Sequence, residues 1–109
     1  IHGAHIAHSV IGIRSVVNEG AVLREVILMG QDRYETPEQR EETAGLPARG
    51  IGAHCQLTHA IIDKGARIGD GVVITSHQGK PNEDGDCYHV RDGIVIIPKN
   101  AVVPDGRRI

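Results

Sequence analysis

The chain has almost no aromatic side chains. Of its 109 residues only Tyr34 and Tyr88 are aromatic, and it contains no Phe and no Trp. A conventional core of this size buries several large rings, because aromatic side chains supply much of the apolar area of a core. Their scarcity argues against a thick interior and favours a fold whose interior is narrow.

Strong net charge and long apolar runs are also missing. The formal net charge is −2, so composition provides neither the basic surface expected of a nucleic-acid-binding protein nor attraction to an anionic membrane. No apolar run approaches the roughly 20 residues that a transmembrane helix needs, and no signal peptide is visible. We therefore expect neither a nucleic acid nor a membrane as a partner.

Cysteine is scarce as well. Cys55 and Cys87 are the only two, and two cysteines do not make a disulfide framework. We expect Cys55 to be a buried thiol, Cys87 to lie in a loop, and the protein to be cytoplasmic, where thiols stay reduced. The sequence begins at Ile1, without Met and in the middle of a repeat pattern, which predicts that it is part of a longer protein.

What the sequence does contain is a six-residue repeat, clearest between Ile51 and Thr75. Aliphatic residues recur there every six positions with one slip, and the same period returns upstream and downstream. The residue two positions earlier is usually small or aliphatic, as in Ala21, Cys55 and Ala66. The periodic aliphatic residues are Ile11, Val17, Leu23 and Met29, then Ile51, Leu57, Ile62, Ile68 and Ile74, then Ile97, Val103 and Ile109.

Such a hexapeptide period is typical of a parallel β-helix. Each hexad supplies a short strand and a corner. The aliphatic side chain points inward, where its burial is worth roughly 1.5–3 kcal/mol. A Gly, Asn or Asp after it tolerates the left-handed backbone of the corner. Three hexads close a coil of about 18 residues, and coils stack about 4.8 Å apart. Helices of this repeat class coil left-handed, an exception to the right-handed crossover rule.

We therefore predict one all-β domain over residues 1–109, a left-handed parallel β-helix with two corner insertions. The hexapeptide blocks cover about residues 1–30, 51–75 and 94–109, and the insertions cover 31–50 and 76–93.

The two insertions differ in composition. In the first, Thr36, Pro37 and Gln39 form a capping-box pattern. This pattern predicts a short helix from Pro37 to Ala44, ended by Gly45. The second insertion is rich in Gly and Pro, which predicts a flexible loop without a helix.

Lys64 and Lys99 are the candidate binding residues. Each stands two positions after an inward aliphatic residue, and the two are one full coil apart if the second insertion is an excursion from a corner. Their ammonium groups then lie on one face in neighbouring rungs, where they repel each other unless an anion lies between them. Lysine suits phosphate as a point charge, and Arg67 and Arg91 could add to the positive field. The alternative is that Lys64 and Lys99 are two solvated surface lysines that bind no ligand.

No pattern in the sequence predicts catalysis or metal binding. The seven histidines include a five-spaced pair, His54 and His59, of the kind that holds zinc in γ-class carbonic anhydrases. His54 is one place out of register for that use, and spacing alone is weak evidence for zinc. There is no phosphate-cradling glycine loop and no nucleophile with a base and an orienting group. We predict no catalytic residue and no metal ligand in this segment.

Three strings resemble one family closely. They are HSVIGIRSVVNEGAVLREVILMGQDRYET at 8–36, IGAHCQLTHAIIDKGARIGDGVVI at 51–74 and DGIVIIPKNAVVPDG at 92–106. In unbroken order they resemble the C-terminal β-helix domain of glucose-1-phosphate adenylyltransferase (ADP-glucose pyrophosphorylase), closest to its cyanobacterial and plant branch.

The resemblance implies a function for the whole enzyme and a role for this part of it. The enzyme makes ADP-glucose from ATP, used with Mg²⁺, and glucose 1-phosphate, for glycogen or starch synthesis. Catalysis belongs to an N-terminal nucleotidyltransferase domain that is absent here, so no cofactor is expected in this domain. The implied role is allosteric regulation and oligomerisation. The implied partners are that catalytic domain, further copies in a homotetramer, and a phosphorylated metabolite or inorganic phosphate.

In that branch the lysine of the AIIDK string and the lysine of the last repeat contact the effector anion. They fall on Lys64 and Lys99 here, and Arg91 is predicted to contribute as well. The family usually carries a longer, more helical insertion before the GIV string, so the identity of the effector stays open. Two alternatives also stay open: a stand-alone hexapeptide-repeat enzyme, either an acyltransferase or like a γ-carbonic anhydrase, and a purely structural β-helix module.

Overall fold

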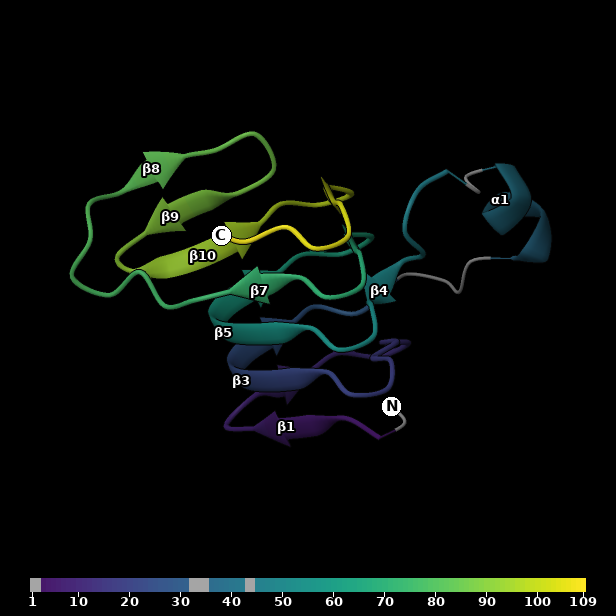
Figure 1. Cartoon of the computed structure of the whole chain (residues 1–109), viewed down its shortest axis with the longest axis horizontal. Coiled ribbons are helices and arrows are strands. Elements are labelled where there is room, and N and C mark those ends of the chain that lie inside the picture. The colour runs from purple at the N-terminus through teal and green to yellow at the C-terminus, as the bar shows by residue number, and fades with distance from the viewer. Residues whose placement is uncertain (1–2, 32–35, 43–44) are drawn as a thin grey trace.

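The computed structural model describes residues 3–31, 36–42 and 45–109. In it the chain winds into a parallel β-helix, and Figure 1 shows β1, β3 and β5 stacked one above the other with β10 beyond them. One sheet has the order β1-β3-β5-β10-β9-β8, with β2 on β3 and β7 on β5, and a second has the order β11-β6-β4. The strands are β1 (His5–Ala7), β2 (Val10–Ile11), β3 (Val22–Leu28), β4 (Gly50–Ile51), β5 (Gln56–Ile62), β6 (Arg67–Ile68), β7 (Val73–Ile74), β8 (Glu83–Asp84), β9 (His89–Arg91), β10 (Ile94–Ile97) and β11 (Val102–Val103).

The interior of the helix is filled by the predicted aliphatic positions. Small residues two positions earlier, such as Ala21, Cys55 and Ala66, are buried as well. Ile11 and Ile109 pack against the two ends of this core and are only partly buried. The fully buried repeat positions are Val17, Leu23, Ile51, Leu57, Ile62, Ile68, Ile74, Ile97 and Val103.

The coils are shorter than predicted. Val10 pairs with Ile27 and Gly50 pairs with Arg67, so neighbouring rungs are 17 residues apart rather than 18. Each coil has one residue fewer at one of its corners. This corner lies inside β3 in one coil and inside β5 in the next. There Glu25 and His59 both have a φ of 56°, and a left-handed residue turns the chain more tightly than an extended one. One side of each coil therefore needs five residues.

The shorter side corrects one predicted core residue. Met29 was expected to point inward, but its side chain is 43% exposed, and Leu28 is 2% exposed in its place. Leu28 follows Leu23 by five residues, just as Ile62 follows Leu57. The slip visible in the central block therefore also occurs in the first block, where Met29 and Leu28 are both plausible apolar candidates.

The first insertion contains the predicted helix, α1 (Pro37–Glu42), which projects from the side of the β-helix beyond β4 in Figure 1. Its capping box is formed: Thr36 Oγ1 accepts the Gln39 N–H at 3.1 Å, and Gln39 Oε1 accepts the Thr36 N–H at 3.0 Å. No residue of α1 is buried. Its predicted end at Ala44 lies outside the described residues. In the described part of the chain no helix is long and apolar enough to cross a membrane.

The second insertion is a β-hairpin, so the prediction of a loop alone was wrong. β8 and β9 pair antiparallel with each other, and β9 pairs antiparallel with β10. The last rung would otherwise leave the N–H and C=O groups of β10 unpaired at its edge, and an added strand satisfies them. Val90 lies opposite Val95 and is fully buried, which anchors the hairpin to the core. The outward–inward–outward pattern of His89, Val90 and Arg91 is the sequence signal that was missed.

Candidate functional site

Lys64 and Lys99 lie in neighbouring rungs at one corner of the β-helix. Ile62 pairs with Ile97 in parallel register, and the N–H of Asn100 donates to the carbonyl oxygen of Lys64 at 3.0 Å. The register agrees with the adjacency predicted by counting hexads. The predicted adjacency holds because the chain leaves the coil as a hairpin over residues 76–93 and then resumes the coil in the same strand direction.

The two lysines line a surface depression of about 320 Å³. Lys64 is half-buried and Lys99 is exposed. Among the described residues that line the depression there are three cationic side chains and no carboxylate. The lining residues are Gln31, Gln39, Arg49, Lys64, Gly65, Lys99 and Asn100.

A glycine shapes the floor of the depression. Gly65 has a φ of 74°, and a Cβ placed on it would collide with the side-chain oxygen of Asn100. Asn100 itself has a φ of 62°, and Asn is one of the few residues that tolerates this region. The absence of a side chain at Gly65 therefore lets the side-chain oxygen of Asn100 lie against the backbone of Gly65.

Five lining residues were not predicted from the sequence, and two of them, Gly65 and Asn100, directly follow the lysines. The first insertion, residues 31–50, contributes the other three, Gln31, Gln39 and Arg49. None follows the hexapeptide register of the lysines, so a count of repeats could not find them. They reach the depression because the first insertion folds back against this corner. Arg67, which is buried, donates from Nη1 to the carbonyl oxygen of Pro47 at 3.0 Å and so fixes the end of the insertion.

Arg91 lies elsewhere. It is on β9, where its guanidinium donates to Asp84 Oδ1 at 2.7 Å and to the carbonyl oxygen of Glu83 at 3.1 Å. His89 Nδ1 lies 2.7 Å from the same carboxylate. These contacts, that of His89 first, lower the pKa of Asp84. Arg91 is thus part of the hairpin and does not line the depression that holds the lysines.

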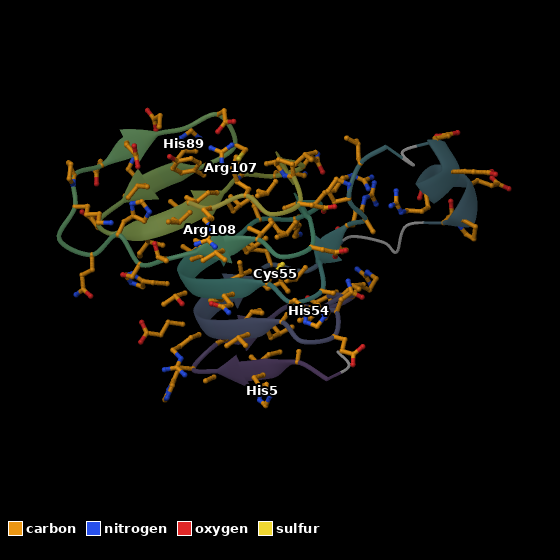
Figure 2. The ribbon with its side chains drawn as sticks, in the orientation of Figure 1. His5, His54, Cys55, His89, Arg107 and Arg108 are labelled. Carbon is orange, nitrogen blue, oxygen red and sulfur yellow. The ribbon has the colours of Figure 1, made fainter. Side chains whose placement is uncertain are left out.

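The histidines are spread over several parts of the molecule. Figure 2 shows His5 on the first strand, His54 on the central coils and His89 on the hairpin. His54 is exposed at one corner, whereas His59 Nδ1 lies 3.2 Å from Ser76 Oγ. Within residues 3–31, 36–42 and 45–109, no three His, Cys, Asp or Glu side chains are grouped so that they could hold a metal ion.

A second, larger groove of about 500 Å³ runs beside the first insertion. Its lining includes Asp70 and Asp105, which stack at one corner of successive coils. Asp70 Oδ1 accepts the Ala53 N–H at 2.8 Å, and Asp105 Oδ1 accepts the Asp70 N–H at 2.8 Å. These carboxylates cap the main chain of the corner, so we assign them a structural role.

A family model described as the GLGC left-handed parallel beta-helix domain matches residues 1–107, which confirms the predicted handedness. The chain is 40% identical over 111 residues to the glucose-1-phosphate adenylyltransferase small subunit, chloroplastic/amyloplastic, of Triticum aestivum, covering 97% of this chain and 23% of that protein. It is 43% identical over 106 residues to large subunit 1 of the same enzyme, chloroplastic/amyloplastic, of Zea mays, covering 94% and 20%. The chain thus spans about a fifth of the length of these relatives.

Proposed function

The chain belongs to the family of the GLGC left-handed parallel beta-helix domain, and from this premise we propose that it is the regulatory and oligomerisation domain of a glucose-1-phosphate adenylyltransferase. In this proposal Lys64 and Lys99 bind inorganic phosphate or a phosphorylated metabolite. The observation that carries the proposal is the stacking of the two lysines in adjacent rungs of one corner, beside a depression of about 320 Å³.

The electrostatics of the corner support an anion as the ligand. The backbones of neighbouring rungs are about 4.8 Å apart, so the two lysines carry like charges on adjacent rungs, and like charges on adjacent strands repel each other. An oxyanion between the two ammonium groups turns that repulsion into two charge-assisted hydrogen bonds. The side-chain amide of Asn100 adds a hydrogen-bond donor to the site. The half-buried position of Lys64 partly excludes water from it.

The complete enzyme is proposed from the relatives. Both are named as subunits of glucose-1-phosphate adenylyltransferase and are about four to five times as long as this chain. We place the formation of ADP-glucose from ATP and glucose 1-phosphate, with its Mg²⁺, in a nucleotidyltransferase domain outside this chain. The role of the β-helix is then to sense an anion and to contact that domain and other subunits. The names "small subunit" and "large subunit" support assembly into an oligomer.

The compartment is proposed from the thiols. Cys55 and Cys87 are both free in the structure, and free thiols persist in a reducing compartment. We propose the cytoplasm, while the two relatives are named as chloroplastic or amyloplastic proteins.

An NMR titration with inorganic phosphate tests the anion site. The amide signals of Lys64, Gly65, Lys99 and Asn100 should shift in a saturable way, and sodium chloride at equal ionic strength should not reproduce the shifts. Lys99→Ala should weaken binding about tenfold, because a charge-assisted contact is lost. Arg108→Ala, which removes an exposed cation outside the depression, should leave binding unchanged.

The same experiment separates the other candidate functions. No phosphate-dependent shift at this corner, even at high concentration, would reject the anion site and favour a purely structural module. Stoichiometric zinc in the purified protein, or tight binding of acetyl-CoA, would instead support a stand-alone hexapeptide-repeat enzyme.

A further inference from the structure

One outer face of the β-helix carries a column of aliphatic side chains. It is the face formed by β2, β10 and the parts of β3 and β5 that follow their internal corners. In parallel register Val10 pairs with Ile27, Ile27 with Ile61, and Ile61 with Ile96. These four residues, called here the apolar ladder, occupy four successive rungs.

The apolar ladder points away from the core. On β3, Ile27 is 43% exposed, whereas its neighbours Val26 and Leu28 are 0% and 2% exposed. Val10 is 64% exposed, and the other two members of the ladder are half-buried. A sheet face in contact with water usually places polar residues at its outward positions. The ladder breaks that rule on every rung.

The neighbouring face obeys the rule. Its outward positions on β1, β3 and β5 include His5, Arg24, Gln56 and Thr58. Within residues 3–31, 36–42 and 45–109, five large apolar side chains are exposed, and four belong to the ladder or to the corner that follows it. These four are Val10, Ile13, Ile27 and Met29. Exposed apolar groups that gather in one patch mark an interaction surface.

We propose that the apolar ladder packs against the ladder of a second copy of this chain, with the two β-helices antiparallel and related by a twofold axis. The inference rests on the oligomerisation role proposed above and names the surface and the partner. A twofold interface is self-complementary, so one patch serves both copies. A second β-helix also repeats at the same spacing of about 4.8 Å, whereas an α-helix repeats at about 5.4 Å.

The order of residues along the ladder fixes which ones meet. All four rungs of both copies are covered only when the twofold axis passes between the rungs of Ile27 and Ile61. Val10 then faces the partner's Ile96, and Ile27 faces the partner's Ile61. A shift by one rung leaves an apolar rung of each copy exposed.

Charge complementarity favours the antiparallel arrangement. Glu25 and His59 lie at the corner two residues before Ile27 and Ile61, and both have a φ of 56°. In the antiparallel dimer Glu25 faces the partner's His59, and this pair occurs twice by symmetry. His59 Nδ1 lies 3.2 Å from Ser76 Oγ, and Nε2 is the nitrogen assigned to the carboxylate. With the helices parallel, Glu25 faces the partner's Met29 instead, which leaves a carboxylate against an apolar side chain.

Sedimentation equilibrium of the chain tests the dimer. The four rungs span only about 14 Å, so the interface is small and we expect a Kd on the order of 10⁻⁵ to 10⁻⁴ M. Ile27→Thr keeps a β-branched side chain on the strand and should weaken the dimer about tenfold, because the change occurs in both copies. Val22→Thr is the matched control: Val22 is on the same strand but on the neighbouring face. It should leave Kd unchanged.

Isotope-filtered NMR tests the arrangement in an equal mixture of carbon-13-labelled and unlabelled chains. Methyl contacts should appear between Val10 of one copy and the partner's Ile96. Within one chain these residues are three rungs, about 14 Å, apart, so the contact can come only from the partner. A contact between Val10 and the partner's Val10 would show parallel helices and overturn the proposal.

The remaining outcomes also decide the proposal. Self-association that Ile27→Thr does not weaken, or that Val22→Thr weakens equally, overturns this inference and leaves oligomerisation to another face. A monomer at all concentrations overturns it and rejects self-assembly by this domain alone; that result is expected if a segment outside residues 1–109 covers the ladder. Amide spectra check that the variants are folded, and Ile61→Thr replaces Ile27→Thr if the latter is misfolded. Phosphate binding at Lys64 and Lys99 is measured separately and survives each of these failures.

Discussion

The main-chain N–H of Asn100 donates to the carbonyl oxygen of Lys64 at 3.0 Å. Through this bond the corner that carries Lys99 stacks directly on the corner that carries Lys64, although the β8–β9 hairpin lies between them in the sequence. The backbone thereby holds Lys64 and Lys99 in neighbouring rungs, independently of their side-chain conformations. The register of the coils therefore brings the positive charges of the two lysines to the same corner.

The first prediction concerns the repulsion at this corner. Lys99→Gln should raise the melting temperature slightly, by about 1 °C, at low ionic strength without phosphate, because it removes a like charge from the neighbouring rung. The gain should vanish in salt, which screens exposed charges. In phosphate the order should reverse, since the unmodified protein gains stability from bound anion. Thermal melts in the three buffers test this, and a variant less stable in all three would contradict it.

The second prediction concerns two glycines with left-handed backbone. Gly30 has a φ of 83°, and a Cβ there would collide with the carbonyl oxygen of Ile13, whereas Gly71 has a φ of 68° and open space around it. Gly71→Ala should cost about 1–2 kcal/mol from backbone strain alone. Gly30→Ala adds a collision with the main chain and should cost about 2–5 kcal/mol in total. Urea denaturation of both variants measures the difference, and equal costs would show that strain alone matters.

The third prediction concerns the core. Leu57 is fully buried on β5 in the middle of the stack. Leu57→Ala should lower the free energy of unfolding by about 2–5 kcal/mol, since it removes apolar contacts and leaves a cavity between neighbouring coils. Gln56→Ala, at the exposed preceding position, should change it by about 0.5 kcal/mol or less. Similar losses in the two variants would mean that Leu57 does not lie inside the coil.

The fourth prediction concerns the contact between the hairpin and the C-terminal coil. The Arg107 guanidinium donates to both oxygens of Asp86, at 3.0 and 2.8 Å, and this hydrogen bonding lowers the pKa of Asp86. Because the folded-state pKa is depressed, the contact persists above the ordinary aspartate value of 3.8 and is lost as the pH falls through the lower value.

Carbon-13 NMR of the side-chain carboxyls tests this. Asp86 should titrate below 3.8 in the unmodified chain, and Arg107→Ala should move its midpoint up toward that value. Asp84 serves as the internal control, because its partners are His89 and Arg91 and its low pKa should persist in the variant. An unchanged Asp86 midpoint would mean that the pair does not form in solution.

The fifth prediction concerns the two thiols. Burial raises the pKa of both Cys55 and Cys87, so both should react slowly at neutral pH, because the thiolate is the reactive form. Cys55 is fully buried and its thiol donates to the carbonyl oxygen of Gly69 at 3.0 Å, whereas Cys87 is partly exposed. Iodoacetamide should therefore modify Cys87 faster, by about tenfold or more, since Cys55 reacts only when the coil opens. Mass spectrometry follows both sites, and equal rates are expected only in denaturant.

The features that follow from the sequence alone are those with a local cause. A six-residue period places aliphatic residues such as Leu57 and Ile68 inside the coil, because each hexad makes one strand and one corner wherever it occurs. The same period relates Lys64 to Lys99 across the second insertion. The capping box of Thr36 and Gln39 predicts α1, since all its partners lie within four residues.

Only the tertiary structure decided the features that depend on packing between coils. Met29 faces outward because Glu25 turns the chain one residue early, and either Leu28 or Met29 satisfies the local pattern. Residues 76–93 form strands because the edge of β10 needs hydrogen-bond partners, a demand that comes from another part of the chain. Arg49 joins the two lysines because the first insertion folds back on their corner. No periodicity in the sequence encodes that approach, because it depends on where a non-repetitive segment packs.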